Sequence, residues 1–94
     1  MTMTCTATQL IDDDRTRVTR FDFVPGQQTG WHVHAYDYVI TALTDCHMAL
    51  EEPGGETRHV TIPAGTAYRR NTGVEHNVIN AGDTLMSFIE VELK

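Results

Sequence analysis

The sequence has few cations, few cysteines and no long apolar run. Seven Lys and Arg residues stand against thirteen Asp and Glu, which gives the 94-residue chain a formal net charge of −6. This charge disfavours binding to nucleic acid or to an anionic membrane, because both need clustered cations to meet phosphate. Two cysteines are too few for a disulfide scaffold. No apolar run approaches the roughly 20 residues that span a bilayer.

The first residues also lack the features of a secretory signal. Residues 1–9 are rich in threonine and contain neither a basic start nor an apolar stretch. A hydrophobic share of 40% is nevertheless enough for a packed core. We therefore expect a cytoplasmic protein with a single domain over residues 1–94, in which residues 1–14 form a flexible or peripheral segment.

In place of helical periodicity, the chain contains short segments typical of β-strands. In residues 17–24, for example, Val18, Phe21 and Phe23 lie among polar residues, as in a half-buried strand. Turn residues such as Pro25-Gly26 separate the segments. The segments are 17–24, 31–34, 37–44, 47–51, 58–62, 66–70, 75–79 and 85–93. Eight closely spaced strands without an internal helix predict an all-β fold, either a closed barrel or a jelly roll.

Three of the five histidines are candidate metal ligands. His32 and His34 are two residues apart, so on a strand they face the same side with Cα atoms about 6.6 Å apart. This spacing allows both imidazoles to reach one metal ion at about 2.1 Å. An antiparallel sheet would bring His76 opposite them. His47 and His59 lie among polar residues, and we expect them at the surface.

The histidines and nearby glycines resemble the two signature motifs of the cupin superfamily. The segment Gly26-x5-His32-x-His34 is similar to the start of G-x5-H-x-H-x3,4-E-x6-G. The second motif, G-x5-P-x-G-x-x-H-x-x-x-N, is matched at four fixed residues, Gly65, Gly73, His76 and Asn80, whereas Asn71 replaces the proline. The resemblance covers residues 26–80. It implies a single small β-barrel, the double-stranded β-helix of RmlC-like jelly rolls.

A second frame of the later motif also fits in part. Pro63-x-Gly65-x-x-Tyr68 matches the middle of the motif, but it puts tyrosine at the histidine position and Thr72 at the asparagine position. The frame that supplies an imidazole is chemically more sensible, because histidine is the commoner ligand. We therefore assign the third ligand to His76.

The chain departs from the first motif at its glutamate ligand. Tyr38 stands at that position, and Asp37 precedes it. A regular strand from His32 would turn Tyr38 inward and Asp37 outward, although a bend at Ala35-Tyr36 would reverse this. Three neutral histidines are therefore the leading ligand set, and Asp37 is a candidate additional ligand. We interpret Tyr38 as a candidate catalytic residue, a hydrogen-bond donor or acid beside the metal.

The resemblance implies one divalent ion, Fe, Mn, Ni or Zn, in a mononuclear enzyme. Three neutral ligands leave the full charge of the ion in place, which favours a small chelating or anionic substrate. By similarity to three-histidine cupins, the expected reaction is dioxygenase-like. A non-redox metal-dependent lyase or isomerase is the enzymatic alternative. A non-catalytic cupin that binds or senses a small ligand is the alternative from a different class.

The resemblance also implies a homodimer, because small cupins commonly pair through a sheet face. A barrel of 10.5 kDa buries a modest share of its surface, and its edges need cover. We expect light scattering at micromolar concentration to give twice the mass of the chain. A mass of one chain would contradict this prediction.

Overall fold

The computed structural model describes residues 3–94, and Met1 and Thr2 lie outside the described residues. Within this range the chain forms nine strands and no helix. The strands are β1 (Thr6–Asp12), β2 (Thr16–Phe23), β3 (His32–Val33), β4 (Asp37–Ala42), β5 (Cys46–Glu51), β6 (Thr57–Ile62), β7 (Ala67–Arg70), β8 (Glu75–Asn80) and β9 (Met86–Leu93). In residues 3–94 we find no helix long and apolar enough to cross a membrane.

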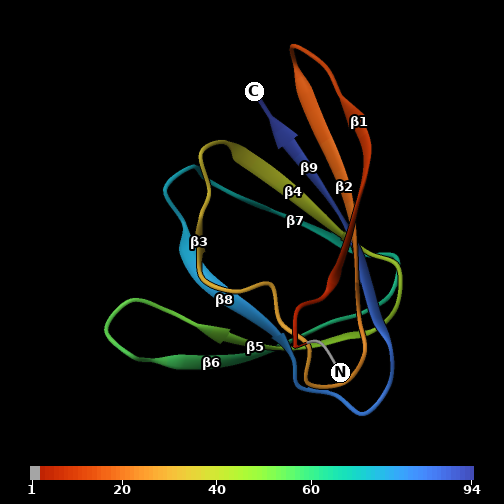
Figure 1. Cartoon of the computed structure of the whole chain (residues 1–94), viewed down its shortest axis with the longest axis vertical. Coiled ribbons are helices and arrows are strands. Elements are labelled where there is room, and N and C mark those ends of the chain that lie inside the picture. The colour runs from red at the N-terminus through yellow and green to blue at the C-terminus, as the bar shows by residue number, and fades with distance from the viewer. Residues whose placement is uncertain (1–2) are drawn as a thin grey trace.

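The strands form two sheets that face each other (Figure 1). The larger sheet has the order β1-β2-β9-β4-β7, and the smaller has the order β3-β8-β5-β6. The pairings between neighbouring strands are antiparallel. Two facing sheets of this kind form a jelly roll, so the all-β, double-stranded β-helix fold predicted from the sequence is confirmed.

The core lies between the sheets and follows the two-residue period of the strands. In β4, Tyr38, Ile40 and Ala42 are buried, whereas the residues between them are only partly buried. Phe88 of β9 packs at the centre of the larger sheet, with ring centroids 5.3 Å from Phe21 and 5.5 Å from Phe23. Aromatic packing of this kind holds the base of the barrel together. Phe21 and Phe88 also face the space between the sheets.

Strand β1 is the one strand that the sequence did not indicate. It lies in the segment predicted to be peripheral, and it pairs along the edge of the larger sheet with β2. Every residue of β1 is exposed, including Leu10 and Ile11. A strand with no buried face needs no alternation of apolar and polar residues, so its sequence carries no strand pattern.

A glycine in the turn before β8 fixes the backbone around the second histidine. Gly73 has a φ of +90°, and its N–H donates a 2.8 Å hydrogen bond to the carbonyl oxygen of His34. We expect Gly73→Ala to lower the free energy of unfolding by about 1–2 kcal/mol, because a Cβ disfavours this left-handed backbone. No atom within 4 Å would meet the added Cβ, so the cost is one of backbone conformation. Urea unfolding measures it, and an unchanged midpoint would contradict the prediction.

Candidate metal centre

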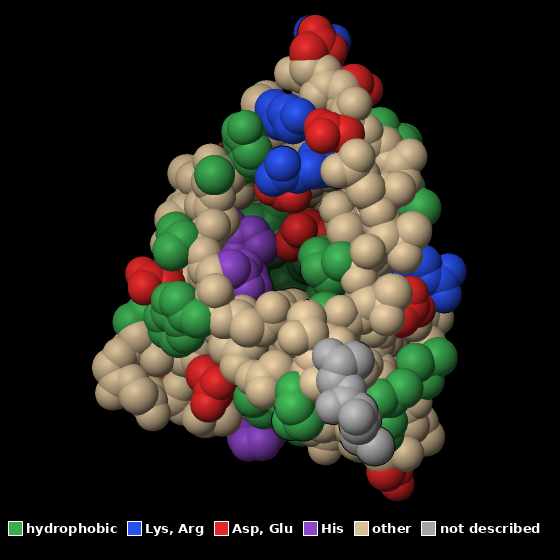
Figure 2. Space-filling model, viewed as in Figure 1, with side chains coloured by type: hydrophobic (Ala, Val, Ile, Leu, Met, Phe, Trp, Pro, Cys, Tyr) green, Lys and Arg blue, Asp and Glu red, His purple; other side chains and the backbone are tan. Residues whose placement is uncertain are grey.

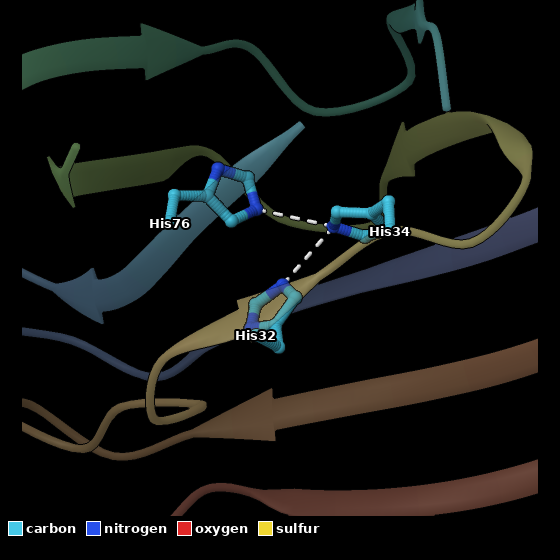
Figure 3. A group of neighbouring side chains, drawn as sticks. All are labelled: His32, His34 and His76. Carbon is cyan, nitrogen blue, oxygen red and sulfur yellow. Dashed lines mark hydrogen bonds between the residues drawn. The ribbon is translucent and has the colours of Figure 1, made fainter. Parts of the chain in front are cut away.

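Two elements of the smaller sheet bring the three predicted ligands together. His32 opens β3, His34 follows the end of that strand, and His76 is the second residue of β8. The antiparallel pairing of β3 with β8 places His32 directly opposite His76. Figure 3 shows the three rings turned toward one another. His47 and His59 are exposed, and neither belongs to the cluster.

The three rings meet through their Nε2 atoms. The Nε2 atom of His34 is 3.0 Å from that of His32 and 3.1 Å from that of His76. Two nitrogens that bind one ion at about 2.1 Å, at a right angle to each other, are about 3.0 Å apart. The spacing of the donor atoms therefore fits a shared metal ion.

The protonation of the rings also suits metal binding. The Nδ1 atom of His32 is 2.9 Å from the carbonyl oxygen of Gly30, which can only accept a hydrogen bond. Nδ1 therefore carries the proton, and Nε2 presents its lone pair to the centre. Burial, and next the neighbouring His32, lower the pKa of His34 to about 4. The same two causes lower the pKa of His76 to about 4, so both rings are neutral at pH 7.

A hydrogen-bond network centred on Asn77 holds the loop that carries His32. The buried Asn77 side chain accepts a 2.9 Å bond from the backbone N–H of Gly30 and donates a 2.7 Å bond to Glu51. It also donates to Gln28 in the same loop. The sequence analysis missed this residue, although its position directly after a predicted ligand is a signal for a supporting role.

Tyr38 lies beside the cluster with its ring inside the barrel. The chain bends at Ala35 and Tyr36, yet Tyr38 still faces inward and is 2% exposed. Its ring stacks on His34, with centroids 3.8 Å apart and an interplanar angle of 14°. Among residues 3–94 the Tyr38 hydroxyl has no hydrogen-bond partner, although it is buried. Burial raises the pKa of this hydroxyl, so it stays protonated.

Asp37 does not join the histidines. Its carboxylate accepts 2.8 Å hydrogen bonds from the backbone N–H of Thr72 and from the guanidinium of Arg69. The Thr72 N–H, together with Arg69, keeps the pKa of Asp37 below its usual range. The carboxylate is therefore an ionised surface group on the outer side of β4.

We expect Asp37→Asn to leave the metal content unchanged. The amide oxygen can still accept the hydrogen bond of Thr72, and the exposed ion pair with Arg69 contributes little to stability. Elemental analysis of the purified variant tests this. Loss of the metal would mean that the carboxylate turns inward to bind it.

The histidines line one side of a cavity of about 190 Å³ between the sheets. Figure 2 shows the opening, with histidine and acidic side chains in its wall. Much of the lining is apolar or aromatic, including Phe21, Ile40, Met48 and Phe88. A site of this size, smaller than the roughly 300–1,000 Å³ typical of drug-sized ligands, suits a small molecule.

The acidic residue in the cavity wall is Glu90, which the sequence analysis missed. A Glu90 carboxylate oxygen is 3.7 Å from Nδ1 of His34. Burial, and next the neighbouring Glu92, raise the pKa of Glu90 to about 7. The signal was present, because Met86, Phe88 and Glu90 alternate along β9 and therefore share one face.

Comparisons with known proteins agree with the fold. The family model described as the cupin domain matches residues 19–92. The β-alanine degradation protein BauB of Pseudomonas aeruginosa is 48% identical over 84 residues, which cover 89% of this chain and 87% of BauB.

Two solved structures show the same fold. A cupin domain protein of Bordetella pertussis Tohama I superimposes with a TM-score of 0.92 and 43% identity, over 97% of this chain and 94% of its own. The polyketide cyclase RemF of Streptomyces resistomycificus has a TM-score of 0.73 and 28% identity, over 95% of this chain and 64% of its own.

Proposed function

The chain belongs to the cupin domain family, and from this premise we propose that it is a mononuclear metal-dependent enzyme. In this proposal His32, His34 and His76 hold one divalent ion, and a small anionic substrate enters the cavity beside it. The observation that carries the proposal is the convergence of three Nε2 atoms on one point. Nitrogens at 3.0 and 3.1 Å from one another are spaced as the ligands of one shared ion are.

The proposed reaction is dioxygenation of a small carboxylate or chelating compound. His32, His34 and His76 would hold the ion as neutral ligands, and an ion with its full double charge would supply Lewis-acid or redox chemistry to an anionic substrate. The relative BauB is named for β-alanine degradation, so we propose small amino carboxylates as the substrate class. The small size and apolar lining of the cavity support a compound of this kind.

A specific observation favours the second candidate, a non-redox lyase or isomerase. The Tyr38 hydroxyl is buried without a partner and belongs to a residue of the cavity wall. A protonated phenol in such a place can donate a proton or a hydrogen bond to the substrate. This chemistry does not require a redox-active metal.

The metal in the purified protein separates these possibilities. The protein should be prepared without chelators and without a nickel column, and its metals measured by elemental analysis. We expect one divalent ion per chain, with iron and oxygen uptake in the presence of β-alanine if the enzyme is a dioxygenase. Zinc without oxygen uptake would contradict the dioxygenase and favour the lyase or isomerase. Absence of any metal, together with failure to bind added iron or zinc, would contradict the proposal as a whole.

A further inference from the structure

A buried carboxyl group in the cavity has no hydrogen-bond partner. Glu90 is 8% exposed and lines the cavity together with the three histidines. Its distance of 3.7 Å from the Nδ1 atom of His34 exceeds that of a hydrogen bond. Within residues 3–94, no side chain or backbone N–H donates a hydrogen bond to it. The carboxylate opens onto the cavity and meets no donor from the protein, so it is available to a donor group of a ligand.

Glu92, the neighbouring acid on the same face of β9, has the hydrogen-bond donors that Glu90 lacks. Glu92 accepts two hydrogen bonds of 2.8 Å from the guanidinium of Arg17. Arg17 is thereby engaged outside the cavity and does not line it. No Lys or Arg belongs to the cavity wall in the part of the chain that the structure describes. Glu90 therefore has no cationic side chain hydrogen-bonded to it, and Arg17 acts on it only electrostatically, from outside the cavity.

The other groups near this wall also favour a cation. Phe21 and Phe88 pack against each other and both line the cavity, as does Tyr68. The faces of aromatic rings attract an ammonium group, particularly where water is excluded. Glu90 and these rings line the same cavity.

We propose that Glu90 is a specificity-determining residue that binds the protonated amine of the substrate. This inference rests on the proposed function, in which the carboxylate of the same substrate is directed to the histidine cluster. A substrate held by both groups carries its carboxylate at the histidine cluster and its amine at Glu90, within one cavity. A cavity of about 190 Å³ limits the compound to a short chain.

Binding of three matched probes tests the inference on the unaltered protein. β-Alanine carries both charges, propanoate lacks the amine, and ethylamine lacks the carboxylate. Isothermal titration of the metal-loaded protein should give β-alanine an affinity at least about tenfold higher than that of propanoate, as one added ion pair in a desolvated site would produce. Equal affinities for β-alanine and propanoate would overturn the inference without need of any variant.

The Glu90→Gln variant tests whether Glu90 causes the preference for β-alanine over propanoate. It removes the charge and keeps the shape, so we expect β-alanine to lose about tenfold in affinity while propanoate changes little. Glu75→Gln is the matched control, because it removes one negative charge beside His76 from a side chain that is exposed and outside the cavity. The control should keep the preference for β-alanine. A preference that survives in Glu90→Gln would overturn the inference.

Ethylamine separates failure of this inference from failure of the proposed function. In protein stripped of metal, ethylamine should still bind at Glu90. The Glu90→Gln substitution should lower its affinity about tenfold. If ethylamine binding depends on Glu90 in this way but the unaltered protein cannot bind any metal, the metal-dependent enzyme is rejected and the amine site is retained. Metal binding with no effect of Glu90→Gln on ethylamine would reject the amine site and retain the metal centre.

Discussion

His76→Ala is expected to abolish stoichiometric metal binding. The Nε2 atom of His76 is 3.1 Å from that of His34, and its ring is buried, so no other side chain can take its place. Loss of an outer hydrogen-bond partner of a ligand already costs about 10- to 100-fold in metal affinity. Loss of the ligand itself should cost more than 100-fold, because two histidines remain. Elemental analysis and titration against a competing chelator measure the effect.

The same loss is expected for alanine at His32 and at His34, since each supplies one of the three nitrogens. His59→Ala is the matched control, because this histidine is exposed on β6 and lies outside the cluster. The control should bind one equivalent of metal, as the unaltered protein does. Full metal content in a correctly folded His76→Ala variant would refute the assignment of the third ligand, and with it the frame chosen for the second motif.

Tyr38→Phe is expected to lower turnover about 10- to 1,000-fold while the metal remains bound. The range is that of losing a general acid or an electrostatic donor. The phenyl ring can keep the stacking on His34, whose ring centroid is 3.8 Å away. Because the hydroxyl is buried without a partner among the described residues, its removal should leave the free energy of unfolding equal or slightly higher.

Three measurements on the Tyr38→Phe variant test this prediction. Metal content should match that of the unaltered protein, and the midpoint of urea unfolding should not fall. Turnover alone should drop. Release of the metal would identify the phenol oxygen as a fourth ligand, and unchanged turnover would reduce Tyr38 to a packing residue. A protein that only binds a ligand would show altered affinity and no turnover in either form.

The core strands and the histidine cluster were predictable because their residues obey simple periods. Tyr38, Ile40 and Ala42 are apolar or aromatic at every second position, which indicates a strand with one buried face. The two-residue spacing of His32 and His34 directs both rings to the same side for the same reason. The pairing with His76 followed from the resemblance, since sequence spacing alone does not determine which strands pair.

Glu90 could not be recognised with equal ease because the inward face of β9 changes character along its length. Met86 and Phe88 fill the apolar base, whereas Glu90 and Glu92 on the same face lie where the barrel becomes polar. A sequence pattern that changes from apolar to acidic at the same period suggests the end of a strand. The structure shows that the alternation continues through Glu90, which lies inside beside His34.

The position of β9 has a consequence for how the protein is made. Residues 86–93 form the middle strand of the five-stranded sheet, between β2 and β4. During translation, β2 and β4 therefore leave the ribosome long before the strand that joins them. Their unpaired edges are open to other chains in this interval, and pairings between distant segments form slowly. The β5–β6 hairpin can form as soon as both of its strands have left the ribosome, because they are adjacent in sequence. We expect nascent chains that end before residue 86 to contain all three histidines and yet be recognised by chaperones as unfolded.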